Sequence, residues 1–65
     1  MTKQQMIDRM NEVVKQFYGC ETTFGRKVQR MNVQKVTQIY NVYRLNKDEP
    51  IASQVRLLNS WVENI

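Results

Sequence analysis

A chain of 65 residues is long enough for one small domain, and its single cysteine and lack of histidine exclude an internal disulfide and the usual zinc sites. Without histidine the usual general base near neutral pH is also missing, so we expect a binding protein with no cofactor rather than an enzyme. The net charge is +4. Residues 22–47 carry all of the excess, with no acidic residue among six basic ones: Arg26, Lys27, Arg30, Lys35, Arg44 and Lys47.

The start of the chain is polar, and no apolar run approaches the ~18 residues that a membrane span needs. These features, together with one unpaired thiol, predict a soluble protein in the reducing cytoplasm, without a membrane partner. The thiol, Cys20, follows Gly19 at an expected helix end. We interpret it as a small, half-buried apolar residue and not as a catalytic group.

The first predicted element is a helix over about 3–18. Thr2 and Gln5 have the spacing of a capping box, and Gly19 supplies the left-handed residue that commonly ends a helix. The apolar residues between them recur at helical intervals and form one stripe. The stripe contains Met6, Ile7, Met10, Val13, Val14, Phe17 and Tyr18.

Two more helices are predicted in the basic middle of the chain. Thr22 and Thr23 are able to cap a short helix whose inward positions are Phe24, Val28 and Met31. Asn32 is the expected cap of a third helix over about 33–44. Its inward positions are Val36, Ile39, Tyr40 and Tyr43.

A strand remains an alternative for this third element, because valine, threonine and tyrosine are better strand formers than helix formers. A strand would place apolar residues on both of its faces, and no Asn-Gly or Asp-Gly turn offers a hairpin partner. The helical pattern is cleaner, so we favour a helix.

Pro50 belongs in the first turn of a fourth helix, because its backbone angle is fixed and it has no N–H to donate. The apolar residues that follow, Ile51, Val55, Leu58, Val62 and Ile65, are spaced like a coiled-coil seam. We therefore predict an all-α domain over 1–65, a bundle of about four helices that forms a homodimer through the last one. The predicted dimer or partner interface contains Ile51, Val55, Leu57, Leu58, Trp61 and Val62.

Residues 22–43 also have the pattern of a helix-turn-helix. Phe24 and Gly25 supply an apolar residue and a small one that lets the second helix cross closely, Met31 fills the turn, and Val36 and Ile39 anchor the second helix. In layout this segment resembles the small phage-type repressors and Cro-like regulators. The turn, residues 29–32, is about one residue longer than in that family and lacks its glycine.

The resemblance and the charge together predict a DNA-binding transcriptional regulator of phage or mobile-element type. The side chains expected to approach the major groove of duplex DNA are Gln34, Lys35, Gln38 and Asn41. Those expected to hold backbone phosphates are Arg26, Lys27, Arg30, Arg44 and Lys47. The prediction requires that the two helices cross and present these groups outward together.

Two other interpretations stay open. The chain is also suited to bind and inhibit a host protein through its last helix, with Leu57 and Trp61 as anchors. Alternatively, the helices pack in a larger assembly, for which the four methionines offer adaptable contact surfaces.

Overall fold

The computed structural model describes residues 1–63 and folds them as four helices with no strand among them. The helices are α1 (Lys3–Tyr18), α2 (Phe24–Gln29), α3 (Val33–Leu45) and α4 (Ile51–Val62). The predicted all-α bundle of four helices is therefore confirmed. None of the helices described in residues 1–63 is long and apolar enough to cross a bilayer.

Capping residues set both ends of α1. The Thr2 hydroxyl accepts a hydrogen bond from the Gln5 backbone N–H at 3.1 Å, and the Thr2 N–H donates to the Gln5 side chain at 2.8 Å. At the other end Gly19 adopts a φ of 74°, a backbone conformation that glycine tolerates without steric cost. Both features agree with the prediction from the sequence.

The last turn of α1 differs from the prediction. Phe17 and Tyr18, expected in the inward stripe, are 44% and 50% exposed, because this turn extends past the end of the core. Their rings pack edge to face against each other at 5.1 Å, and the Tyr18 hydroxyl accepts a hydrogen bond from Asn59 of α4. Cys20, expected to be half-buried, is also exposed.

Residues 33–45 form a helix, which rules out the strand alternative. Asn32 caps α3, since its side-chain oxygen accepts a hydrogen bond from the Lys35 N–H at 2.8 Å. Thr37 is accommodated inside the helix because its hydroxyl donates to the Val33 carbonyl one turn earlier. The four predicted inward positions of this helix are all buried: Val36, Ile39, Tyr40 and Tyr43.

Pro50 lies immediately before α4 and serves as its N-cap residue, one position earlier than predicted. The seam of α4 is used inside the single chain: Val55, Leu58 and Val62 are buried in the domain itself. These three residues are therefore removed from the predicted dimer interface, because a partner cannot reach them while the domain is folded. Ile65 lies outside the described residues.

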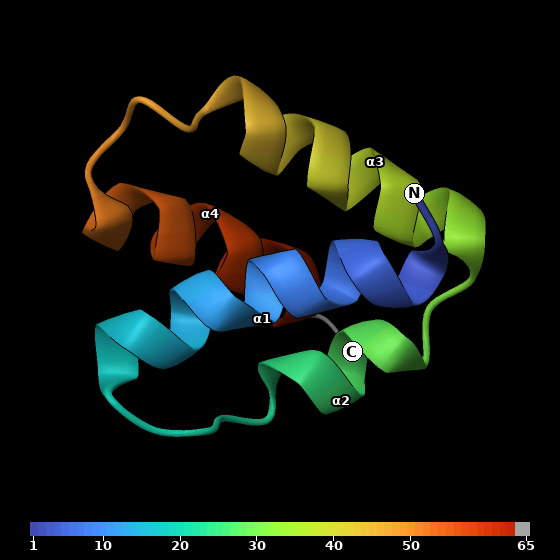
Figure 1. The fold of residues 1–65 in the computed structure, drawn as a ribbon, viewed down its shortest axis with the longest axis horizontal. Helices are drawn as coiled ribbons and strands as arrows, with labels where there is room; N and C mark the ends of the chain where they lie inside the picture. The colour runs from blue at the N-terminus through green and yellow to red at the C-terminus, as the bar shows by residue number, and fades with distance from the viewer. Residues whose placement is uncertain (64–65) are drawn as a thin grey trace.

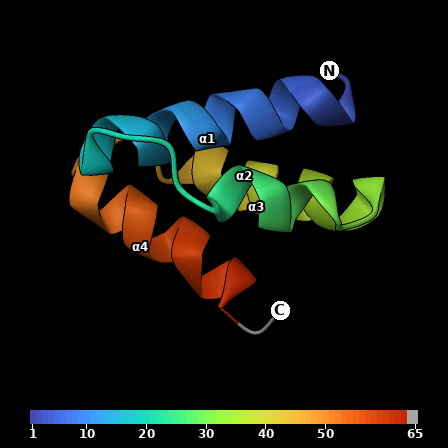
Figure 2. The ribbon, with the colours of Figure 1, turned by 90° about the horizontal axis from the view of Figure 1, so that it is seen from below.

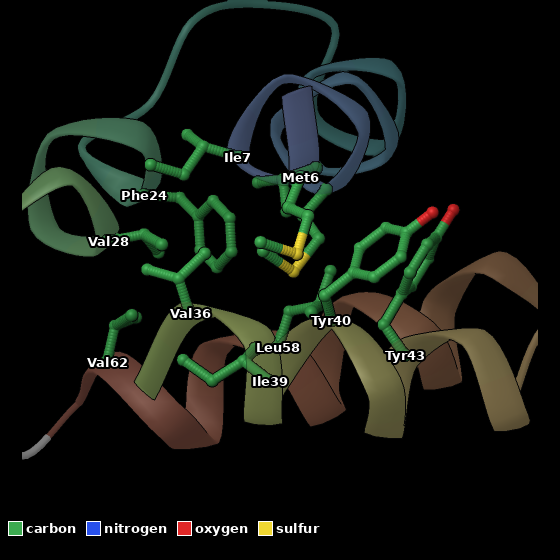
Figure 3. Close-up of a cluster of buried hydrophobic side chains, with 12 residues drawn as sticks. Met6, Ile7, Phe24, Val28, Val36, Ile39, Tyr40, Tyr43, Leu58 and Val62 are labelled. Atoms are coloured by element: carbon green, nitrogen blue, oxygen red, sulfur yellow. The ribbon is translucent and has the colours of Figure 1, made fainter. Parts of the chain in front are cut away.

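Helix α1 crosses one side of the bundle with α4 behind it, and α2 and α3 flank α1 on opposite sides (Figures 1 and 2). All four helices contribute to one apolar core, in which Phe24 and Val28 of α2 face Val36 of α3 (Figure 3). The outer faces of α2 and α3 consequently point in different directions. The core cluster contains Met6, Ile7, Met10, Val14, Phe24, Val28, Val36, Ile39, Tyr40, Tyr43, Leu58 and Val62.

Candidate nucleic-acid interface

The outer face of α3 is a continuous polar stripe. Gln34, Gln38 and Asn41 are all exposed, and at about 100° per residue they lie on the side of the helix opposite its buried residues. Leu45, four residues after Asn41, extends this stripe and is 82% exposed. The predicted placement of the three amides on one accessible face is confirmed, and the structure adds an apolar side chain to their row.

Two exposed cations border this stripe. Lys35 and Arg44 are nine residues apart, so they lie about 180° from each other around α3, one on each side of the amides. Lys35 is on the α4 side, with its ammonium group 4.7 Å from the centre of the Trp61 ring. Arg44 is exposed and lies on the opposite border, near the end of the helix.

The first turn of α3 adds a positive partial charge. No acidic residue lies in that turn, so the positive end of the helix dipole is not neutralised there. Arg30, the C-cap residue of α2, precedes this turn by three residues and is also exposed. The beginning of α3 is therefore the more electropositive end of the stripe.

Helix α2 places most of its cations elsewhere, contrary to the predicted common surface. Arg26 and Arg30 line a groove of about 680 Å³ between α1 and α2, whose walls also carry Asp8 and Glu21. Lys27 instead faces a hollow beside the end of α4, which Glu63 also lines. Arg26 and Lys27 thus lie apart from the α3 stripe, because α2 and α3 occupy opposite flanks of α1.

Gly25 has another role than the one expected for it in the helix-turn-helix pattern. Gly25 does not provide space for α3. A Cβ atom at this position would lie 3.2 Å from the side chain of Asn11 in α1, so the glycine serves the packing of α2 on α1.

A second hollow, of about 430 Å³, lies between α1 and α3. Tyr40 and Tyr43 form part of its wall, with their ring centres 6.0 Å apart and their hydroxyl groups leaving the core on the same side (Figure 3). Burial raises the pKa of the Tyr43 hydroxyl, Tyr40 raises it further, and Arg9 lowers it. The other residues that line the hollow are Asp8, Arg9, Glu12, Val13 and Lys47.

Lys47 is therefore close to Arg9 and the two tyrosines, and not on the α3 stripe. The sequence prediction missed Arg9 because it belongs to the electrically neutral first third of the chain. The same prediction placed Tyr40 and Tyr43 in the core and gave their hydroxyl groups no role. The available signal was the residue type: tyrosine in place of phenylalanine at positions 40 and 43 implies hydroxyl groups that must find water or a polar partner.

What remains of the predicted partner surface on α4 is discontinuous. Leu57 and Trp61 are half-buried, and Trp61 packs against the core with Lys35 over its ring. Ile51 is exposed at the opposite end of the helix. Because the seam residues between them are buried, these three side chains do not form one continuous apolar strip along α4.

Comparisons of the chain with protein-family models, with curated proteins and with solved structures find no match.

Proposed function

We propose that this chain binds duplex DNA by inserting the outer face of α3 into the major groove. The observation that carries the proposal is the pattern on that face, a row of amides bordered on both sides by a cation. A B-form major groove is wide enough to admit an α-helix, and asparagine and glutamine amides pair with the edge of adenine through two hydrogen bonds. Leu45 suits the methyl group of thymine.

The two bordering cations fit the two DNA strands. A helix in the major groove lies between two phosphate backbones, and Lys35 and Arg44 point toward opposite walls of such a groove. The un-neutralised N-terminus of α3 and Arg30 add positive charge at one end, where phosphates favour binding. This mode of binding retains the predicted role of α3 but assigns no DNA contact to Arg26 or Lys27.

The test is selection from a random duplex library, followed by fluorescence anisotropy on the selected and on unrelated duplexes. Gln34→Ala and Gln38→Ala are expected to lose about 1–3 kcal/mol of discrimination at the base each one contacts, with little change on unrelated duplexes. Lys35→Ala and Arg44→Ala are expected to weaken binding to all duplexes similarly.

The control is Arg56→Ala, because Arg56 is exposed on α4 and carries the same charge as Arg44. A wild-type chain that fails to bind any duplex near physiological salt contradicts the proposal. An Arg56→Ala variant as impaired as Arg44→Ala contradicts the assignment of binding to α3.

A further inference from the structure

The hollow between α1 and α3 brings together two tyrosine hydroxyls and two cations that lie outside the α3 stripe. Tyr40 and Tyr43 are only 6% and 8% exposed, so their rings are part of the core and their hydroxyl ends are what solvent can reach. Neither hydroxyl forms a hydrogen bond with another group in residues 1–63, and neither is among the buried polar atoms without a partner. Two hydrogen-bond donors are thus fixed side by side and remain available to a ligand.

Arg9 and Lys47 supply positive charge beside these hydroxyls. Within residues 1–63 the only ion pair is between Lys15 and Glu21, so neither Arg9 nor Lys47 is neutralised by a carboxylate within 4.0 Å. The proximity of Arg9 to Tyr43 is also evident in its lowering effect on the pKa of that hydroxyl. Burial, Tyr40 and Arg9 together still raise that pKa above its usual value. The Tyr43 hydroxyl therefore keeps its proton at neutral pH and is able to donate a hydrogen bond.

Two carboxylates share the hollow, and their positions decide whether an anion fits. The Asp8 carboxylate accepts a hydrogen bond from the Gln4 side chain at 2.8 Å, which holds it along its own helix. Arg9 and Val13 lie closer to the α3 side of α1 than Asp8 or Glu12, which are about 60–100° farther round the helix from Arg9. Among residues 1–63, Glu12 has no hydrogen-bond or ion-pair partner that would hold it near the tyrosines, so it opposes an anion only partly.

We propose that the hollow is a binding site for a phosphate group, held by the hydroxyls of Tyr40 and Tyr43 and by the charges of Arg9 and Lys47. Phosphate oxygens accept hydrogen bonds from tyrosine hydroxyls and pair with cations of both kinds. The site adjoins the Arg44 border of the α3 stripe, so the phosphate belongs to a DNA strand if the chain binds DNA as proposed. Only that assignment of the source rests on the proposed function.

The first arm of the test uses inorganic phosphate alone. Titration followed by NMR is expected to shift the signals of Tyr40, Tyr43 and Val13 in a saturable way, beyond the effect of chloride at matched ionic strength. Tyr40→Phe and Tyr43→Phe preserve the ring that the core needs and remove only the hydroxyl. Each is expected to weaken phosphate binding by about threefold or more, because a hydrogen bond to a charged group is lost.

Charge variants give effects of opposite sign. Arg9→Gln is expected to weaken phosphate binding and Glu12→Gln to strengthen it, each by about threefold. Tyr18→Phe is the matched control, because it removes a tyrosine hydroxyl that bonds Asn59 and lies outside the hollow. Phosphate shifts no larger than those of chloride, or tyrosine variants that bind phosphate as the wild type does, overturn the site.

The second arm measures duplex binding by the same variants. If the DNA supplies the phosphate, Tyr40→Phe and Tyr43→Phe weaken duplex binding in parallel with phosphate binding. A chain that binds free phosphate but no duplex keeps the site, assigns it to a free phosphate ligand and overturns the proposed function. A chain that binds duplex with no effect of phosphate or of the tyrosine variants overturns the site and leaves the proposed function standing.

Discussion

Asn11 fills the space that Gly25 leaves between α1 and α2. Its Nδ2 donates a hydrogen bond to Glu21 at 2.9 Å, while its Oδ1 is buried against the glycine and has no partner within residues 1–63. A Cβ atom on Gly25 would lie 3.2 Å from both Cγ and Nδ2 of Asn11, closer than ordinary van der Waals contact. The Asn11 side chain therefore limits what position 25 is able to hold.

Gly25→Ala is expected to stabilise the protein more in an Asn11→Ala background than in the wild type. Alanine stabilises a helix by about 0.8–1.0 kcal/mol more than glycine does. In the Asn11→Ala background the new methyl group at position 25 has room, so α2 gains this stabilisation in full. With the wild-type Asn11 in place, the new methyl group must displace that hydrogen-bonded side chain, and this cost offsets the stabilisation. Urea unfolding of the wild type, the two single variants and the double variant gives the four free energies of unfolding that check this prediction. Equal effects of Gly25→Ala in both backgrounds contradict it.

The residues that the sequence predicted well act within their own helix. Thr2, Gly19 and Asn32 are caps, and a cap needs only its neighbours in the chain to be recognised. The role of Gly25 depends on which helix lies against it, and nothing within a few residues of it carries that information. The helix-turn-helix pattern accordingly assigned the glycine to α3, whereas its neighbour is in α1.

At the scale of one element, α3 depends on its cap more than on helix propensity. Valine, threonine and tyrosine in this segment favour strands, yet Asn32 satisfies the Lys35 N–H and the apolar residues fall on one face that the core buries. The position of the cap also determines where the electropositive end of the stripe lies. Substitutions at Asn32 therefore distinguish an effect on the stability of the fold from an effect on DNA binding.

Asn32→Ala is expected to lower the free energy of unfolding by about 1 kcal/mol, because the side-chain acceptor is lost. Asn32→Asp keeps an acceptor and suits the helix dipole, so it should preserve stability while placing a negative charge at the end that a phosphate would approach. Thermal melts combined with duplex anisotropy check both variants. A loss of DNA affinity in Asn32→Asp no greater than in Arg56→Ala contradicts a role for this end of α3.

Helix α4 shows what the spacing of apolar residues is able to predict and what it is not. The spacing of Val55, Leu58 and Val62 correctly predicted a helix with one apolar side, but the same spacing serves a dimer seam and a monomer core equally well. Only the positions of the other three helices decide between them, and here α1, α2 and α3 supply enough apolar surface to cover that side. The spacing of these three residues is therefore accounted for by the core of the single chain, and a dimer through α4 stays a prediction.

At the scale of the whole molecule, the order of helices around the core was not available from the sequence. Periodicity gives each helix an inward face, but it does not say which helices become neighbours. Because α2 and α3 lie on opposite flanks of α1, the basic block from 22 to 47 is divided among four separate surfaces. Arg9, from the neutral first third of the chain, meanwhile joins Lys47 in the α1–α3 hollow.

This distribution of charge predicts that salt affects stability and binding in opposite directions. No charged side chain is buried in residues 1–63, and the one ion pair, Lys15–Glu21 at 3.7 Å, is exposed on both sides, so it contributes about 0–1 kcal/mol at most. Salt therefore removes little attraction from the fold, while it screens the repulsion of a net charge of +4. The melting temperature should stay level or rise between 50 and 300 mM salt.

DNA binding should weaken over the same range. Contacts to phosphate by Arg30, by Lys35, by Arg44 and by the α1–α3 hollow give a slope of about −3.6 for the logarithm of affinity against that of salt, since each neutralised phosphate contributes about 0.9. Arg44→Ala should reduce the slope by about 0.9 without lowering the melting temperature appreciably. A slope near zero would mean that binding does not depend on phosphates, and a melting temperature that falls with salt would mean that charge pairs hold the bundle together.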